Sequence, residues 1–270
     1  MEEKTDSTYL SDLSEFGVNK NFDIEGLLSN IKKIIKEFSS WVEDNFETIE
    51  NFAHEAYLQI LFSRSGWLLH YTTPFHLIQN DLDPDDLSLI LEKYYKNNWS
   101  IIRNKIEHKM EKLNIDNEAK ETFREALSVH QNGFYRATTT LLFPEIERLF
   151  REVLMNGSLN QFSSLNEARY ILKNTDLRDF TDVYQRTIFS QAMNIYYHTY
   201  SKVKTLEDIS KLKLDSVPNR HASIHGLVKY KSMKTSLNSL FLAEFVFEFF
   251  DKCLNNKITV PEKIFKNANK

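Results

Sequence analysis

Apolar residues recur every three or four positions along most of the chain, which is the spacing of one face of an α-helix. The first such stretch covers residues 27–42, and the second covers residues 46–61. Further stretches, each of which predicts a helix, lie at 87–113, 119–130, 134–154, 180–193 and about 235–254. The sequence therefore predicts an all-α helical bundle with no sheet of consequence.

Three short polar segments have the composition of helix starts. In residues 83–86, Asp83 can cap the first free amides, Pro84 fits the first turn, and two acids favour the positive end of the helix dipole. Residues 164–167 fit a capping box, and residues 205–208 resemble another helix start. These segments predict where three of the helices begin.

Two of the predicted helices have a special feature. Pro144 lies inside the helix over 134–154 and predicts a kink or a split near Leu142, because proline removes one backbone hydrogen bond. The last helix is apolar on nearly all sides, so it belongs at the centre of a bundle or in a subunit interface. Its large apolar residues are Leu240, Phe241, Phe245, Phe247, Phe249 and Phe250.

Composition narrows the fold and the class of protein. Only 6 Gly and 5 Pro occur in 270 residues, too few for a Gly-rich phosphate loop or a sheet with many turns. The one cysteine, Cys253, excludes a disulfide framework and a Cys-based zinc site. No apolar run approaches the roughly 18 residues of a membrane span, and the first residues are acidic and polar rather than a secretory signal. We expect a soluble cytoplasmic protein that does not contact a membrane.

Four regions are expected along the chain: a flexible arm over 1–20, an N-terminal helical region over 21–115, a helical domain over 116–256 and a polar tail over 257–270. The polar gap at 114–117 is the expected boundary between the two helical parts. Charge is uneven, since residues 1–60 hold 13 acids and 5 bases while residues 195–270 hold 7 acids and 13 bases. A basic C-terminal end is a mild indication of a polyanionic partner, although lysine-rich tails are also common on soluble proteins.

One polar cluster stands apart from the helical pattern. Residues 218–226 contain Asn219, Arg220, His221 and His225 and close with Gly226. Three interpretations remain open. The two histidines, four positions apart, could hold a metal if a third ligand came from elsewhere. The segment could be a polar turn whose side chains make structural hydrogen bonds. Alternatively, Arg220 could bind a phosphodiester while His225 transfers protons, since imidazole gains and loses a proton near neutral pH.

The spacing Arg-x4-His, from Arg220 to His225, with a polar residue directly after the arginine, resembles the signature of the HEPN superfamily. Residues 125–127, 130–137 and 142–147 resemble the opening helix pair of that family, in which the second helix contributes an acid. The resemblance covers about residues 118–255 and implies a small all-α domain. It assigns Glu147 as the acid that orients the basic pair. Arg151 lies one turn further on and matches a basic position of some members.

Many HEPN domains are metal-independent ribonucleases of toxin and phage-defence systems, and they generally act as dimers. The resemblance therefore implies an endoribonuclease that needs no cofactor or metal and leaves a 2′,3′-cyclic phosphate. The expected catalytic residues are Arg220, His225, Glu147 and His221, and the expected substrate-binding residues are Asn219, Arg151 and Gly226. Expected partners are RNA, a second copy of the chain, and an antitoxin or trigger protein that contacts the N-terminal region. The alternative is a non-catalytic dimeric HEPN-like module that binds a nucleotide or a protein.

Overall fold

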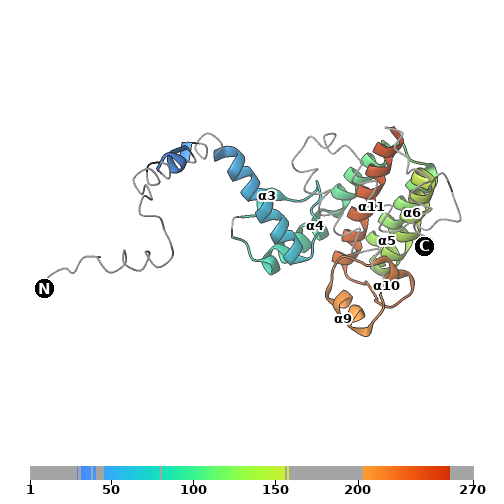
Figure 1. Ribbon diagram of the computed structural model, residues 1–270. Helices are drawn as coiled ribbons and strands as arrows, with labels where there is room; N and C mark the ends of the chain where they lie inside the picture. Colours follow the sequence, from blue (N-terminus) through green and yellow to red (C-terminus); the bar gives the residue numbers. More distant parts are fainter. Residues whose placement is uncertain are drawn as a thin grey trace, which may run out of the picture. The chain divides into compact units, whose positions relative to one another are not determined.

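The computed structural model describes residues 29, 32–37, 39–40, 46–79, 81–155, 157 and 203–255. Within these residues every regular element is a helix, so the all-α prediction is confirmed for this part of the chain. The predicted arm, the helices expected at 164 and over 180–193, and the tail lie outside it. The elements are α3 (Phe46–Ser65), the 3-10 turn η2 (Phe75–Leu77), α4 (Pro84–Glu111), α5 (Asn117–Gln131), α6 (Tyr135–Met155), α9 (Leu206–Leu214), α10 (Arg220–Ile224) and α11 (Met233–Asn255) (Figure 1).

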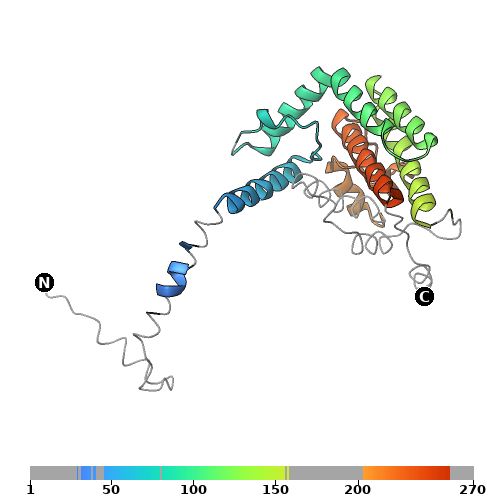
Figure 2. The same ribbon diagram turned by 90° about the horizontal axis from the view of Figure 1, so that it is seen from above.

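The chain forms two compact units, Met1–His54 and Glu55–Lys270. The second unit contains a bundle in which α11 lies alongside α5 and α6 and also packs against α4 (Figures 1 and 2). Fifteen of the 23 residues of α11 are buried. Its aromatic side chains meet those of the neighbouring helices, as in the edge-on pairs Phe123–Phe247 and Phe150–Phe250. Burial within the chain's own bundle thus accounts for the apolar character of α11.

Two of the predicted helix starts lie in the described residues, and both are confirmed. The Asp83 carboxylate accepts a hydrogen bond of 2.8 Å from the amide of Asp85 at the start of α4. At the start of α9, the Thr205 hydroxyl accepts from the Asp208 amide while the Asp208 carboxylate accepts from the Thr205 amide. These side chains satisfy amides that lack a partner within the helix.

Helix α6 continues through Pro144 from Tyr135 to Met155, so of the predicted kink or split, the split near Leu142 does not occur. A proline in a helix interior costs about 3 kcal/mol. The side chains around it offset that cost, because Leu142, Phe143 and Ile146 are all buried in the main core. Packing of one continuous apolar face against the bundle therefore decides the length of this helix.

The polar gap at 114–117 is a short turn inside one compact unit rather than a boundary between units. The Asn114 amide donates to the Asp251 carboxylate at 2.7 Å, and the Asn114 side chain donates to Asn255. These contacts tie the turn between α4 and α5 to the last turns of α11. Helix α4 thus belongs to the same unit as α5, α6 and α11.

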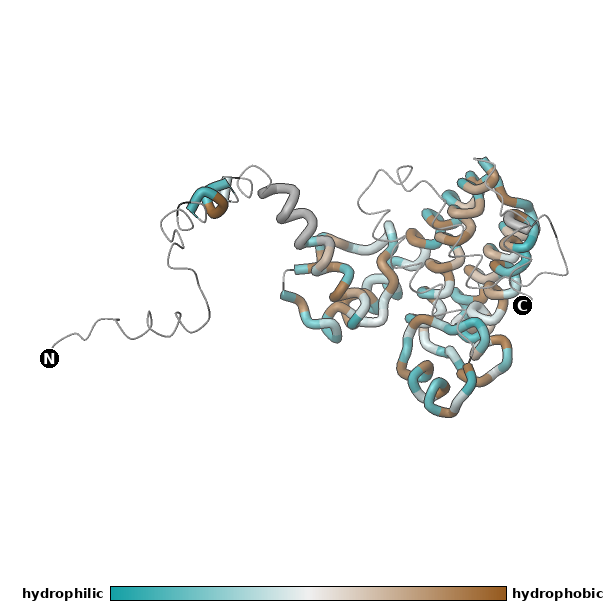
Figure 3. Tube along the Cα trace, in the orientation of Figure 1, coloured by the Kyte–Doolittle hydropathy of each residue, from teal (hydrophilic) through white to brown (hydrophobic). Residues whose placement is uncertain are grey.

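A second, smaller hydrophobic cluster lies beside the main core. It is formed by Leu212 of α9, Ala222 of α10, and Val228 and Tyr230 of the segment that follows. Figure 3 shows many hydrophilic residues on α9 and the nearby loops. The polar segment singled out in the sequence is therefore held by this small cluster, with α10 packed against α6.

No helix among the described residues combines the length and the apolar character that crossing a membrane would require.

Candidate functional site

Helix α10 is a five-residue turn whose start is fixed by Asn219. The Asn219 side chain accepts a hydrogen bond of 2.9 Å from the backbone amide of Ala222. The backbone amide of Asn219 donates to the Tyr230 hydroxyl at 3.0 Å. Asn219 has no exposed surface. Burial raises the pKa of Tyr230 to about 12, so its hydroxyl stays neutral as part of this scaffold. In this arrangement Asn219 shapes the turn and is not exposed to a substrate.

The end of α10 brings His225 to the surface. His225 is the C-cap residue, and its amide donates to the His221 carbonyl at 3.1 Å. Gly226 follows with a φ of +68°, a backbone conformation that residues other than glycine rarely adopt. Space is not the constraint, because a Cβ at this position would meet nothing within 4 Å. The glycine is thus required by the backbone conformation that ends the turn, and both residues are exposed.

The two histidines of the segment lie next to each other. The ring centroids of His221 and His225 are 4.6 Å apart, and the ring planes are inclined by 50°. His221 is half-buried, whereas His225 is exposed. Among the residues that the structure describes, no group of three or more His, Cys, Asp or Glu side chains is arranged to hold a metal ion. What the structure presents here is a pair of imidazoles within one turn.

The segment meets helix α6 through an ion pair between Arg220 and Glu147, which joins guanidinium Nη2 to carboxylate Oε2. The other carboxylate oxygen of Glu147 lies 3.8 Å from Nη2 of Arg151, one turn further along α6. The three side chains are only partly exposed, at 26% for Arg220, 14% for Glu147 and 32% for Arg151. Partial burial limits screening by solvent. Two arginines on one carboxylate leave one unit of positive charge in surplus.

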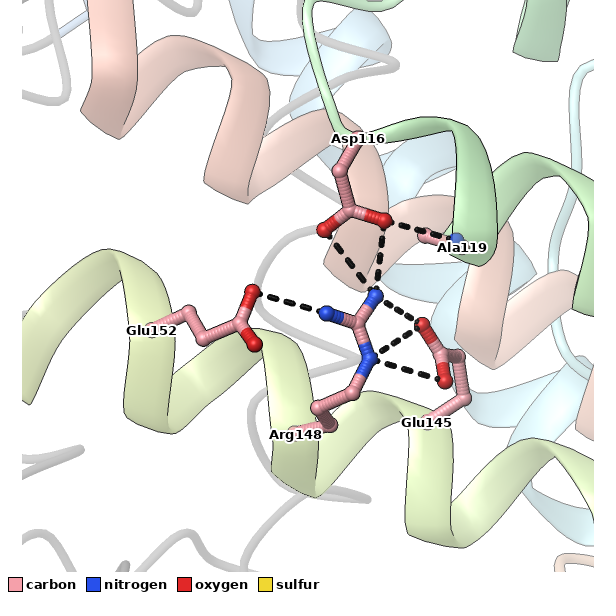
Figure 4. A network of polar contacts seen from close by, with 5 residues as sticks. All are labelled: Asp116, Ala119, Glu145, Arg148 and Glu152. Atoms are coloured by element: carbon pink, nitrogen blue, oxygen red, sulfur yellow. Dashed lines mark hydrogen bonds and ion pairs between the residues drawn. The ribbon is translucent and has the colours of Figure 1, made fainter. Parts of the chain in front are cut away.

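A second ion cluster on α6 has the opposite balance of charge (Figure 4). The Arg148 guanidinium donates to Glu145 and Asp116 through Nη2, to Glu145 through Nε at 3.0 Å, and to Glu152 through Nη1 at 2.7 Å. These carboxylates, above all Glu145, raise the pKa of Arg148. Burial alone would raise the pKa of Asp116, but the hydrogen bonds from Arg148 and the Ala119 amide outweigh it, so that pKa is lowered. We call these four residues, Asp116, Glu145, Arg148 and Glu152, the Arg148 hub.

Sequence reasoning missed a buried polar cluster around Glu244 of α11. The His70 ring binds this carboxylate at 3.0 Å, and Lys109 lies 3.3 Å from its other oxygen. Burial would raise the pKa of Glu244, but the charges of His70 and Lys109 outweigh it and lower that pKa. With side-chain exposures of 6% for His70 and 1% for Glu244, the pair is closed to a large substrate. The signal available in the sequence was the pair of acids Glu244 and Glu248 among the large apolar residues of the last helix.

His130, one of the scattered histidines in the sequence, is a core residue. It is buried, bonds the Ser236 hydroxyl at 2.7 Å, and packs on the Trp99 ring at a centroid distance of 4.3 Å. Burial lowers its pKa to about 4. His130 is therefore uncharged near neutral pH and holds α5 against α11.

Remote residues position the candidate segment as well. The buried Asn238 of α11 donates to the carbonyls of Gly66 and Ser216 at 2.9 and 3.0 Å and accepts from the Leu68 amide. Gly66 has a φ of +70°, and a Cβ there would come within 3.1 Å of the Ser216 hydroxyl. Asn238 thus joins the backbone at Ser216, two residues before Pro218, to the centre of the bundle.

Comparison of the chain with protein-family models, with curated proteins and with solved structures gave no match. The candidate site therefore rests on its own geometry. Of the predicted site residues, Arg220, Glu147 and Arg151 share an ion cluster, and His221 and His225 share a turn that begins at Arg220. Gly226 ends that turn, and Asn219 is buried beneath it.

Proposed function

We propose that the chain is a metal-independent endoribonuclease with a HEPN-like domain over about residues 118–255. The observation that carries the proposal is the ion pair that joins Arg220, at the start of the His-containing turn, to Glu147 of helix α6. A cation fixed by an acid, next to two imidazoles on one turn, is a set of groups that suits attack on a phosphodiester.

In the proposed reaction His225 takes the proton of a ribose 2′-hydroxyl. The 2′-oxygen then forms a bond to phosphorus, and the bond from phosphorus to the 5′-oxygen breaks. His221, whose ring lies 4.6 Å from that of His225, supplies a proton to the leaving oxygen. The products are a 2′,3′-cyclic phosphate and a 5′-hydroxyl, so no water is consumed in this step.

The arginines supply the charge that this transition state requires. A guanidinium has five N–H donors in a planar fork, so it can bind a carboxylate and a phosphate at the same time. Glu147 fixes the orientation of Arg220, and Arg151 adds a second cation to the same carboxylate. The surplus of one positive charge favours a phosphate that gains negative charge as the new bond forms.

The wider setting follows from the HEPN resemblance and is part of the proposal. The protein acts as a toxin or phage-defence effector and works as a homodimer in the cytoplasm. The acidic region over residues 1–60 contacts an antitoxin or trigger protein rather than RNA, because its 13 acids outnumber its 5 bases.

The test is cleavage of a single-stranded RNA by the purified full-length chain in the presence of EDTA. We expect cyclic phosphate ends and a loss of at least about 100-fold in the His225→Ala variant, the effect typical of removing a general acid or base. The matched control is His108→Ala, an exposed histidine on α4 outside the site. Full activity in His225→Ala, with a circular dichroism melting curve equal to that of the parent, would contradict the proposal.

The non-catalytic alternative makes a different prediction in the same assay. A HEPN-like module that only binds a nucleotide or a protein leaves RNA intact, both alone and with its trigger. Growth arrest on expression, lost in His225→Ala but kept in His108→Ala, would favour the ribonuclease.

A further inference from the structure

A pocket of about 470 Å³ lies directly after the candidate site in the chain. It is lined by the end of α9, by the segment that runs from Gly226 to α11, and by the first turn of α11. Its volume falls in the range of pockets that hold a small ligand or one unit of a polymer. The pocket is an element of the fold that the proposed chemistry does not use.

Lysines dominate the charge of this pocket. Lys213, Lys229 and Lys231 line it together with one acid, Asp215, which gives a surplus of two positive charges. The three lysines are exposed. Asp215 is engaged locally, since its carboxylate accepts a hydrogen bond of 2.8 Å from the Val217 amide. We call Lys213, Lys229 and Lys231 the lysine pocket.

The floor of the lysine pocket is built from the segment that directly follows the proposed active site in the chain. Val228 and Tyr230 alternate with the exposed Lys229 and Lys231 and are buried in the small hydrophobic cluster. The Tyr230 hydroxyl accepts from the amide of Asn219, the residue that caps the helix bearing Arg220. Gly226, which lines the pocket, directly follows the exposed His225.

We propose that the lysine pocket binds the phosphate backbone of single-stranded RNA next to the bond that is cut. This inference rests on the proposed function and adds a substrate-binding surface to it. Lysines act as mobile point charges that follow a backbone without reading bases, so the contact is independent of sequence. The neighbouring arginine cluster then receives the phosphate at which the chain is cut.

Binding can be measured without cleavage in the His225→Ala background. Fluorescence anisotropy with a labelled 12-nucleotide single-stranded RNA gives the dissociation constant at several salt concentrations. We expect Lys229→Glu with Lys231→Glu to weaken binding at least about tenfold at low salt. The slope of log K against log salt should fall by about 1.4, because each contact with a single-strand phosphate contributes about 0.7.

The matched control changes the same number of charges elsewhere. Lys93→Glu with Lys96→Glu alters two exposed lysines on α4, which does not line the pocket, and should leave the affinity within about twofold. Equal weakening in both double variants would overturn the inference, because it would show a response to overall charge alone. Unchanged binding in the Lys229 and Lys231 variant, or no RNA binding by the parent, would also overturn it.

Cleavage by the wild-type chain, measured in parallel, separates this inference from the proposed function. If RNA binds through the lysines and is not cut, the ribonuclease proposal fails while the lysine pocket stands. If RNA is cut and the lysines do not affect its affinity, the pocket fails while the ribonuclease stands.

Discussion

Two ion clusters are centred on side chains of helix α6, and they differ in the sign of their net charge. The Arg148 hub sets three carboxylates around one guanidinium, whereas the neighbouring cluster sets Arg151 and Arg220 around the single carboxylate of Glu147. The first has a surplus of two negative charges, and the second has a surplus of one positive charge. Adjacent residues in the sequence, Glu147 and Arg148, thus take part in clusters of opposite character.

The difference separates a structural cluster from a candidate binding site. In the Arg148 hub every guanidinium nitrogen donates to a carboxylate, and one of these acids, Asp116, also caps α5. The hub therefore locks α5 to α6 and repels an anion. The Glu147 cluster joins α6 to a short turn of the small hydrophobic cluster and attracts an anion. Surplus charge, rather than the number of ion pairs, distinguishes the two.

The largest expected effect is on the proposed cleavage of RNA. Arg220→Lys keeps the charge but loses the planar fork, and we expect cleavage of RNA to fall about 100-fold, as for the loss of one preorganised donor to a transition state. Single-turnover cleavage rates measure it. The same exchange in the hub, Arg148→Lys, is the matched control and should leave the rate within about threefold. Equal losses in both variants would remove the distinction between the clusters.

The next largest effect is on the free energy of unfolding. Here we expect Arg148→Lys to lose more stability than Arg220→Lys. Arg148→Lys leaves the buried Glu145 without its bidentate partner, since one ammonium cannot reach three carboxylates. Solvent reaches the hub, so we expect a loss of about 2 kcal/mol in the free energy of unfolding rather than the full cost of an isolated buried charge. Urea denaturation measures it. A smaller loss in Arg148→Lys than in Arg220→Lys would contradict the structural role.

Acid should weaken the hub through Asp116. The pKa of Asp116 is lower in the folded chain than its ordinary value of 3.8. The stabilisation is thus present above that value and is lost as pH falls through the lowered one. We expect Asp116→Asn to be less stable than the parent at neutral pH and to lose less stability on acidification. Melting temperatures between pH 7 and pH 3 measure it; parallel curves for the two proteins would contradict the assignment.

The smallest effect should come from the exposed edge of the hub. The Glu152 side chain is 50% exposed, and exposed ion pairs contribute little. We expect Glu152→Gln to change the free energy of unfolding by about 0.5 kcal/mol or less, in the same urea experiment. A loss as large as that of Arg148→Lys would show that the three acids contribute equally to the hub, which their unequal burial argues against.

Much of the fold could be predicted because its signals are local. The spacing of apolar residues predicts α4, α5, α6 and α11, and side chains such as Asp83 and Thr205 mark where helices begin. Pro144 is the exception. Proline favours a break in a helix, but the burial of the residues around Pro144 outweighs that preference. The local sequence does not show which of the two effects is larger.

The candidate site also combines a local feature, which the sequence predicts, with contacts between residues that are distant in the sequence. The spacing of His221 and His225 predicts that both lie on one turn, and their ring contact is the consequence of that spacing. The pairing of Arg220 with Glu147 joins residues 73 positions apart, so no local spacing indicates it, and only the HEPN resemblance led us to expect Glu147 beside the basic pair. The pairing of His70 with Glu244 joins residues 174 positions apart, and no periodicity indicates it.

The sequence by itself determined that the described part of this chain is helical, where most of its helices begin and end, and which short segment concentrates arginine and histidine. The tertiary structure decided which charges meet, that α11 is covered by its own bundle, and that Asn219 is buried while His225 is exposed. The physical reason is range. Helix propensity, capping and spacing act over a few residues, whereas ion pairing and burial depend on the packing of helices far apart in the chain.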